Sequence, residues 1–255
     1  MDWSNRVVLV TGASSGIGRG LAIELARRGA AVGLLARRGD LLNGIVNEIE
    51  AAGGRALALP ADVTDATAVR NAADELSAKF GPIEVLFANA GVGATTHAKD
   101  LDAKQVASVV DVNIVGVVNS VTAVIPGMVE RGRGQLVAIS SLAAYRGLPK
   151  SAAYCASKAA VSAFFESLRL DLHASSVDVT IIHPGFIKTP LTADRQAKLP
   201  WLLELSDAVD KILKATEARK KSYAFPWQLA TVVRAGMIMP IFMYDWIARR
   251  NSFRE

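Results

Sequence analysis

The feature that most constrains the fold is a glycine-rich segment near the start of the chain. The apolar run Val7–Val10 leads into Thr11-Gly12-Ala13-Ser14-Ser15-Gly16-Ile17-Gly18, and the helix-like stretch Arg19–Arg28 follows at once. Glycines between a strand and a helix let the backbone turn tightly and approach a pyrophosphate, which the N–H groups of the helix N-terminus then bind. The spacing is Gly-x3-Gly-x-Gly rather than the more common Gly-x-Gly-x2-Gly. Its position still predicts a dinucleotide site, with contacts from Gly12, Ser14, Ser15, Gly16, Ile17 and Gly18.

Short apolar runs alternate with helix-like stretches along the chain. The runs rich in Val, Ile and Leu are expected to be buried strands: Arg6–Val10, Ala31–Leu35, Ala56–Leu59, Val85–Ala88, Gln135–Ile139 and Val177–Ile182, with Tyr223–Trp227 as one more candidate. The segments between them have apolar residues three and four positions apart, as amphipathic helices do. This alternation predicts an α/β fold of Rossmann-like type, a doubly wound parallel sheet with helices on both faces.

The length of 255 residues suits one domain, and no linker interrupts the first 190 residues. We divide this single dinucleotide-binding and catalytic domain into a cofactor and catalytic core (1–190), a substrate loop and helix (191–222) and an apolar, basic C-terminal extension (223–255). The N-terminus lacks the pattern of a secretory signal, and Cys155 is the sole cysteine. We therefore expect a cytoplasmic protein.

The substrate segment contains two recognisable parts. Leu191–Leu205 has the composition of a mobile loop whose apolar end, with Trp201, suits a lid over an apolar substrate as well as core or dimer packing. A helix is expected to begin near Ser206, with Asp207 in its first turn. Its last turn would hold Arg219, Lys220 and Lys221, which matches the helix dipole.

The end of the second strand indicates which cofactor binds. An acidic residue at this place usually binds the adenosine 2′-hydroxyl, whereas an arginine accommodates a 2′-phosphate. Here the strand ends in Ala36-Arg37-Arg38, and no acid occurs before Asp40. Alanine removes the repulsion that a carboxylate would exert on a phosphate, and Arg37 offers a planar fork of donors. Two arginines also suit plain solvent-exposed surface, but the missing acid favours NADP(H), with Arg37 and Arg38 beside it.

A tyrosine and a lysine open a later helix. Tyr154 and Lys158 lie on one helical face because they are four residues apart. A nearby ammonium group lowers the pKa of a tyrosine, which can then give a proton to a carbonyl oxygen or take one from an alcohol. Ser141 precedes Tyr154 by thirteen residues, and its hydroxyl can bind a developing oxyanion; Ser140 is its rival. Asn113 lies in an apolar helix, where its amide needs buried partners.

Together these elements resemble the short-chain dehydrogenase/reductase family, in its single-domain, NADP(H)-preferring branch, over about residues 5–190. They follow the family's order: Thr11-Gly12-x3-Gly16-x-Gly18, Asp62-Val63, Asn89-Ala90-Gly91, Asn113, Ser141, Tyr154-x3-Lys158 and Pro184-Gly185. Ala88 departs from the asparagine that many members have before Asn-Ala-Gly. Members share little after Pro-Gly, so the resemblance does not carry over a substrate.

The resemblance implies a role for each element. Tyr154 would be the acid/base and Ser141 would steady the substrate oxygen. Lys158 would lower the tyrosine pKa and hold the nicotinamide ribose, while Asn113 would organise a water-linked proton relay. Arg37 would be the main ligand of the 2′-phosphate. The other cofactor contacts would come from Asp62 and Val63 at the adenine, Ile187 and Thr189 at the carboxamide, and Asn89, Ala90, Gly91, Pro184 and Gly185.

These residues predict an oxidoreductase that transfers a hydride between NADP(H) and a hydrophobic small-molecule carbonyl or alcohol substrate. A 3-oxoacyl-thioester reductase of fatty-acid synthesis is the first alternative, although a long apolar tail is not expected in that group. A non-catalytic, cofactor-binding regulatory protein is the second, and the Tyr/Lys pair counts against it. His97, His173 and His183 have no metal-like spacing, so no metal is expected, and His183 is interpreted as structural.

The C-terminal extension differs most from the family pattern. All of the net charge of +5 lies in Lys214–Glu255, which has eight basic and three acidic residues. Without a recognisable nucleic-acid motif, no nucleic-acid partner is expected. Ala224–Tyr244 carries one charge, and its charge-free run of ten residues is too short to span a bilayer.

Three packing modes remain open for this extension. It packs on the domain, on a sister subunit of a homodimer or homotetramer, or on a membrane surface. On a membrane, its apolar side chains would enter the lipid boundary. The basic residues that would then meet anionic head groups are Arg219, Lys220, Lys221, Arg249, Arg250 and Arg254.

Overall fold

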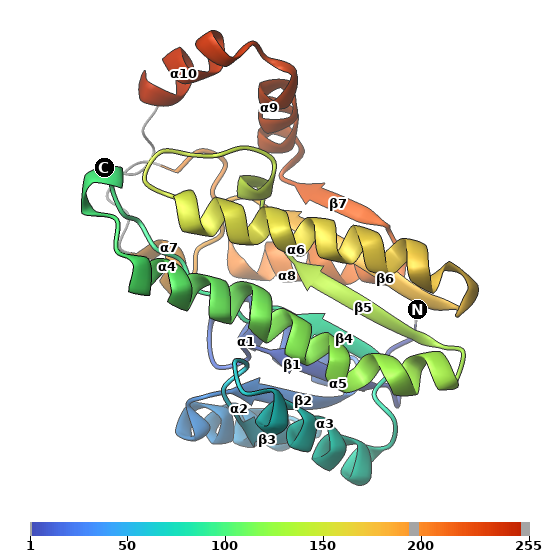
Figure 1. The fold of residues 1–255 in the computed structure, drawn as a ribbon. Coiled ribbons are helices and arrows are strands. Elements are labelled where there is room, and N and C mark those ends of the chain that lie inside the picture. The colour runs from blue at the N-terminus through green and yellow to red at the C-terminus, as the bar shows by residue number, and fades with distance from the viewer. Residues whose placement is uncertain (1, 194–198, 251–255) are drawn as a thin grey trace.

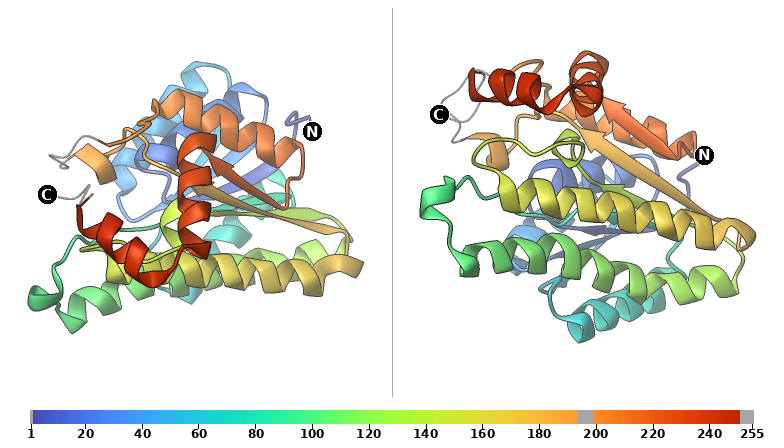
Figure 2. Two further views of the ribbon diagram at one scale, coloured as in Figure 1. Left: turned by 90° about the horizontal axis from the view of Figure 1, so that it is seen from above. Right: turned by 45° about the horizontal axis from the view of Figure 1, so that its top comes forward.

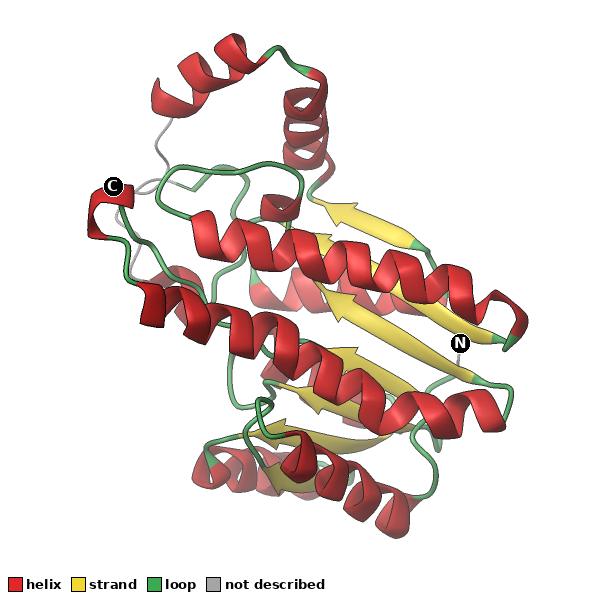
Figure 3. Cartoon of the chain, viewed as in Figure 1, coloured by secondary structure: helices red, strands yellow, loops and turns green. Residues whose placement is uncertain are grey.

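Seven strands form one parallel sheet in the order β3-β2-β1-β4-β5-β6-β7 (Figures 1 and 3). The computed structural model describes residues 2–193 and 199–250. The strands are β1 (Val7–Thr11), β2 (Ala31–Ala36), β3 (Arg55–Pro60), β4 (Val85–Ala88), β5 (Gly134–Ile139), β6 (Val177–Pro184) and β7 (Ser222–Phe225). Strands β1, β2 and β4 are buried along their whole length, as expected of apolar strands that helices cover on both faces.

The predicted fold class is therefore confirmed, with one difference at the sheet edge. The candidate strand Tyr223–Trp227 is β7, but the strand stops at Phe225 and Trp227 begins a helix. Pro226 lies between them and has no N–H to continue the ladder.

Helices cover the sheet in two layers (Figure 2). One layer consists of α1 (Gly16–Arg27), α2 (Gly39–Ala51) and α8 (Leu205–Glu217), and its buried side chains form one core with one face of the strands. The other consists of α3 (Ala66–Phe80), α5 (Gly116–Glu130) and α6 (Ala152–Asp171) and closes a second core. The expected helix near Ser206 is α8, but it ends at Glu217, so the basic residues expected in its last turn follow it instead. Arg219 has a left-handed φ of 49°, which ends the helical path.

The helix that holds Asn113 is interrupted by a wider turn. Helix α4 (Ala103–Val110) continues through a π-helical turn (Asp111–Val115) into α5. The whole stretch Ala103–Glu130 is long and apolar enough to cross a membrane by length and composition. It lies on the sheet instead, because Val117, Val121 and Val124 belong to the second core.

Two further helices follow β7 and stand apart from the layers. They are α9 (Trp227–Ile238) and α10 (Ile241–Arg250), and we call them together the C-terminal cap. The cap lies beyond the carboxyl end of β7 and turns back toward the loop that follows β5 (Figures 1 and 2). The sequence placed an apolar extension here but predicted neither helix.

The strand order places a binding crevice at one edge of the sheet. The chain winds from β1 outward to β3 and then returns to β4 on the other side of β1. Where the order reverses, the loops after β1 and β4 diverge and leave a crevice at the carboxyl ends of the strands, which is where open α/β sheets bind ligands. The glycine-rich segment and Asn89-Ala90-Gly91 follow these two strands.

Candidate active site

A cavity of about 760 Å³ occupies this crevice. It extends from the glycine-rich segment, past the ends of β1, β4 and β5, to the C-terminal cap. Of the predicted site residues, all but Gly18 and Asn113 line its wall. The structure thus brings together residues that are as far apart in sequence as Gly12 and Thr189.

The glycine positions make a close approach to the wall possible. Gly12 has a φ of +66°, and a Cβ there would lie 2.8 Å from Cα of Ala90. A Cβ on Gly18 would lie 2.3 Å from the carbonyl oxygen of Gly12. Gly18 therefore lies behind the loop and lets α1 pack against it. A side chain at either position would displace backbone, so the loop fits the dinucleotide cradle that the sequence predicted.

Asn89 holds the loop to the end of β4. Its Nδ2 donates to the carbonyl oxygen of Thr11 at 2.9 Å. The hydroxyl of Thr11 in turn accepts from the N–H groups of Asn89 and Ala90, both at 3.1 Å. These bonds fix the two sides of the crevice relative to each other.

Both arginines after β2, Arg37 and Arg38, line the cavity. Arg38 donates from Nη2 to Oγ of Ser14 in the glycine-rich loop, at 2.9 Å. Arg37 is 70% exposed, and its Nη1 lies 3.9 Å from Oδ2 of Asp62. The pKa of Asp62 is held below its usual range, first by the N–H of Thr64 and to a smaller extent by Arg37. The sequence pointed to Arg37 as the main ligand of the 2′-phosphate. In the structure, Arg38 is placed equally well to bind an anionic group beside the glycine-rich loop.

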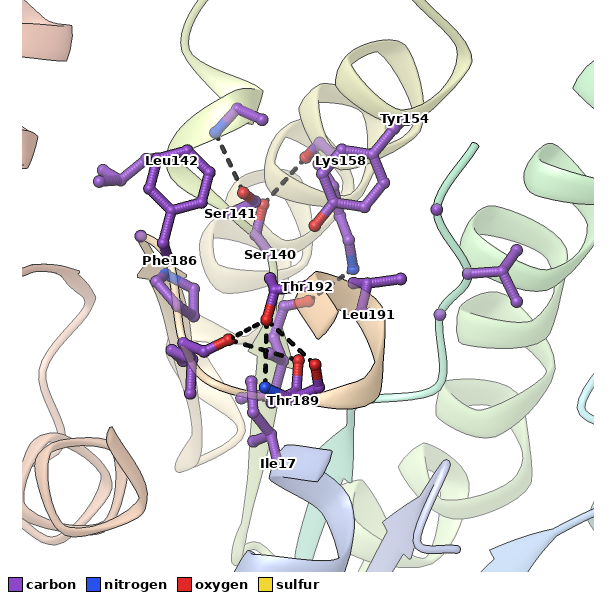
Figure 4. A pocket seen from close by; sticks show the side chains of 18 of the residues that line it. Ile17, Ser140, Ser141, Leu142, Tyr154, Lys158, Phe186, Thr189, Leu191 and Thr192 are labelled. Carbon is purple, nitrogen blue, oxygen red and sulfur yellow. Dashed lines mark hydrogen bonds between the residues drawn. The ribbon is translucent and has the colours of Figure 1, made fainter. Parts of the chain in front are cut away.

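Tyr154, Lys158 and Ser141 face the same part of the cavity (Figure 4). Tyr154 and Lys158 project from α6, and Ser141 lies in the loop that follows β5. Nζ of Lys158 donates to the carbonyl oxygen of Ile139 at 2.9 Å and lies 5.9 Å from the centre of the Tyr154 ring. Burial lowers the pKa of Lys158 to about 8, so its ammonium form still predominates at neutral pH.

The structure separates the two rival serines. Oγ of Ser140 donates to the carbonyl oxygen of Lys158 at 3.0 Å and lies 2.8 Å from Oγ of Ser162. The Ser140 hydroxyl therefore ties β5 to α6. Oγ of Ser141 accepts from the N–H of Ala143 at 3.1 Å, which leaves its own proton to donate into the cavity.

Asn113 lies behind the cavity wall and uses its amide to join three segments. Its Oδ1 accepts from the N–H of Val92 at 2.8 Å, and its Nδ2 donates to the carbonyl oxygen of Val92 at 3.0 Å and to Oγ of Ser157 at 2.9 Å. Oγ of Ser157 then donates to the carbonyl oxygen of Tyr154 at 2.8 Å. The π-helical turn aims this buried amide at the loop after β4, and such turns are frequent at functional sites. A part in a proton relay stays a prediction.

His183 supports the site from beneath. Its Nδ1 lies 3.4 Å from the carbonyl oxygen of Ser141, and its ring packs 4.8 Å from that of Tyr145. Burial lowers the pKa of His183 to about 4, so the ring is neutral at physiological pH. It is absent from the cavity lining, which fits the structural role inferred for it.

Sequence reasoning missed the residues at the far end of the cavity. Arg146 and Leu148 line it from the loop after β5. The C-terminal cap adds a larger, mainly apolar set: Leu229, Val232, Val233, Gly236, Met239, Tyr244, Ile247 and Ala248. The apolar composition of the tail was the only signal, and composition does not say which wall a segment covers.

The comparison with known families agrees with this arrangement. A family model described as short chain dehydrogenase matches residues 6–200. The chain therefore belongs to the short-chain dehydrogenase/reductase family, which comprises nicotinamide-dependent oxidoreductases that act on CH–OH and C=O groups. The match ends before α8, β7 and the C-terminal cap.

Relatives and solved structures extend the likeness. An uncharacterized oxidoreductase of Myxococcus xanthus is 46% identical over 249 residues, 98% of each chain. The glycine betaine reductase ATRR of Emericella nidulans and the probable oxidoreductase EphD of Mycobacterium bovis are 39% and 41% identical over 74% and 75% of this chain, which spans 15% and 32% of their length. A Burkholderia phymatum short chain dehydrogenase/reductase in complex with NAD has a TM-score of 0.85 at 26% identity, covering 92% and 93% of the chains. A 3-ketoacyl-ACP reductase of Sinorhizobium meliloti has a TM-score of 0.78 at 31% identity, covering 86% and 96%.

Proposed function

We propose that this protein is an NADPH-dependent reductase of hydrophobic ketones or aldehydes, and a dehydrogenase of the matching alcohols in reverse. The observation that carries the proposal is the single continuous cavity. One end has the glycine-rich loop and two arginines, the middle has Tyr154, Lys158 and Ser141, and the other end is apolar. A cofactor, a proton donor and an apolar substrate therefore fit side by side.

The chain's own residues would manage the proton and the substrate oxygen. When bound, the nicotinamide supplies or accepts the hydride. Tyr154 gives its proton to the carbonyl oxygen, and the Ser141 hydroxyl donates a hydrogen bond to that oxygen as negative charge develops on it. The ammonium group of Lys158, fixed on the carbonyl of Ile139, favours the phenolate that remains after transfer. Asn113 holds the start of α6 and so keeps Tyr154 in position.

The end of β2 supports NADP(H) over NAD(H). Ala36 lines the cavity where an acidic residue would bind a ribose 2′-hydroxyl, and Arg37 and Arg38 lie beside it. Two similar structures contain NAD. The preference of this chain is therefore proposed from its own residues and not from its neighbours.

The far end of the cavity supports a hydrophobic substrate. Arg146 is the charged side chain at this end of the described wall, and it is already engaged. It donates to the carbonyl oxygens of Gly236 and Met239, and its guanidinium lies 3.8 Å from the centre of the Tyr244 ring. The rest of this end is apolar, and an aliphatic or aromatic carbonyl compound would bury its carbon skeleton here.

A 3-oxoacyl-thioester reductase is the second candidate, favoured by the likeness to the Sinorhizobium meliloti enzyme. Turnover with NADPH separates the two, measured with medium-chain ketones and aldehydes beside a 3-oxoacyl thioester of equal chain length. We expect a higher kcat/KM for the simple carbonyl compounds. A kcat/KM at least tenfold higher for the thioester would establish the second candidate. No turnover of either class would favour the regulatory alternative.

Assembly and location complete the proposal. We propose a homodimer or homotetramer, since Val129 and Leu170 are exposed on the outer helices α5 and α6, and Val115 is exposed at the end of the π-helical turn before α5. We also propose a cytoplasmic location. Light scattering of the purified chain measures the assembly directly.

A further inference from the structure

The C-terminal cap is apolar on both of its faces. In α9, Leu229, Val233 and Gly236 line the cavity, whereas Trp227 and Ile238 are 72% and 88% exposed. In α10, Tyr244, Ile247 and Ala248 line the cavity, whereas the outward set is exposed: Ile241, Phe242, Met243 and Trp246. A helix that is apolar all round is normally buried on all sides. The outer face of the cap therefore calls for a partner.

The exposed apolar surface continues into the mouth of the cavity. Val232 of α9 and Leu191 of α7 (Pro190–Ala193) each line the cavity and are also exposed. Trp201 and Leu202, next to the lining residue Pro200, are exposed as well. Among the described residues, apolar side chains thus extend from the outer surface into the cavity at these positions.

Hydrogen bonds attach the cap to the loop that follows β5. Arg146 binds the carbonyl oxygens at the end of α9, and the hydroxyl of Tyr244 donates to the carbonyl oxygen of Gly147. Arg146 and Gly147 precede the proposed proton donor Tyr154 by eight and seven positions. A partner bound to the cap is therefore coupled to the loop that precedes Tyr154.

Charge decides between a lipid surface and a second copy of this chain. From Ser222 to the end, the chain carries four arginines against Asp245 and Glu255. By its sequence, a segment with this excess positive charge disfavours pairing with its own copy and is complementary to an anionic surface. Exposed Trp and Phe side chains also suit the headgroup region of a bilayer.

The structure also shows that some of the six basic residues expected to meet anionic head groups lie away from the cap. Arg219, Lys220 and Lys221 precede β7, whereas the cap follows it, so they lie at the opposite end of that strand. Arg219 pairs with Asp178 at 3.1 Å, away from the cap. Arg249 and Arg250 end α10, and Arg254 lies outside the described residues.

We propose that the outer face of the C-terminal cap docks on anionic lipid bilayers, and that the cavity takes its carbonyl substrate from the bilayer through the mouth beside Val232 and Leu191. The docking is inferred from the exposed apolar outer face of the cap and from the positive charge of the C-terminal segment. The route for the substrate rests in addition on the proposed function.

Vesicle co-sedimentation tests the docking without any cofactor or substrate. The probe is vesicles of phosphatidylcholine with phosphatidylserine, at low and high salt, beside pure phosphatidylcholine. The variants are Ile238→Glu and Phe242→Glu, which change exposed side chains outside the cavity wall. The matched control is Leu41→Glu, because Leu41 is 45% exposed on α2, at the edge of the sheet opposite the cap.

The wild type is expected to sediment with anionic vesicles, and less so at high salt. Each cap variant should bind at least about tenfold more weakly, since each removes one large apolar contact, while the control binds as the wild type does. No sedimentation of the wild type, or an equal loss in the control, overturns the proposal. A fall in oligomer mass caused by the cap variants alone would identify a second copy as the partner and also overturn it.

A second measurement separates docking from catalysis. With a long-chain ketone dissolved in the vesicles, Ile238→Glu should raise KM at least about tenfold and leave kcat unchanged. With a short, water-soluble ketone, the variant and the wild type should have equal KM. Equal KM for both ketones overturns the substrate route, whereas docking without turnover of any carbonyl compound refutes the proposed function and leaves the docking intact.

Discussion

Removing the arginines after β2 should lower the preference for NADPH. Arg37 is 70% exposed beside Asp62, and Arg38 reaches Ser14 of the glycine-rich loop. A charge-assisted contact contributes about 1.5–3 kcal/mol, and exposure to water places each arginine near the lower end. Arg37→Ala and Arg38→Ala should each reduce kcat/KM for NADPH about tenfold. In the double variant, the reduction in kcat/KM for NADPH should be smaller than the product of the two single reductions, since both side chains would bind one phosphate.

The assay compares kcat/KM for NADPH and NADH in the wild type and in each variant. Ala36→Asp should reverse the preference, because a carboxylate at the end of β2 repels the phosphate and binds the ribose hydroxyl. Arg133→Ala is the matched control, since Arg133 is exposed just before β5, at the other end of the sheet. A wild type that uses both cofactors equally, or a double variant with an unchanged ratio, would refute the reasoning.

Three further changes test other parts of the account. Gly18→Ala places a Cβ 2.3 Å from a loop carbonyl and should weaken NADPH binding in calorimetry by at least about tenfold, whereas Gly44→Ala, with nothing within 4 Å, should not. The pKa of His183 is lowered from 6.5 to about 4, so the unfolded state binds a proton at this side chain before the folded state does as pH falls. The free energy of unfolding, measured with denaturant, should therefore fall by roughly 3 kcal/mol between pH 6.5 and pH 4. The loss should disappear in His183→Gln and persist in a variant of the exposed His173. Arg146→Leu removes a charged bond of about 1.5–3 kcal/mol and should speed hydrogen exchange in the cap; unchanged exchange would contradict the role given to this side chain.

The parts of the fold that local pattern determines were predictable. Buried parallel strands are continuous apolar runs, and the glycine-rich segment needs a left-handed φ at Gly12 and has no room for a Cβ at Gly18. The family order of motifs then placed Ser141, Tyr154 and Lys158, and the structure brings all three to one cavity. Their chemical roles stay predictions.

What depends on long-range packing was not predictable. The π-helical turn at Asn113 arises where α4 joins α5, and no residue type signals it. The C-terminal cap has apolar residues on all sides, so it has no helical periodicity to detect. The engagement of Arg146 with the end of α9 joins residues about ninety positions apart, which only the folded chain reveals.

The central claim is that Tyr154 donates the proton in a nicotinamide-dependent carbonyl reduction. Tyr154→Phe keeps the ring and deletes the hydroxyl, and Tyr145→Phe is the control, because Tyr145 packs on His183 outside the cavity lining. General acid catalysis contributes about 10²–10⁴-fold, so single-turnover oxidation of NADPH by the best carbonyl substrate should slow by at least about a hundredfold in Tyr154→Phe. The Kd of NADPH should stay within about threefold, since the ring packing is kept. A Tyr154→Phe variant that retains more than a tenth of the wild-type rate would contradict the account.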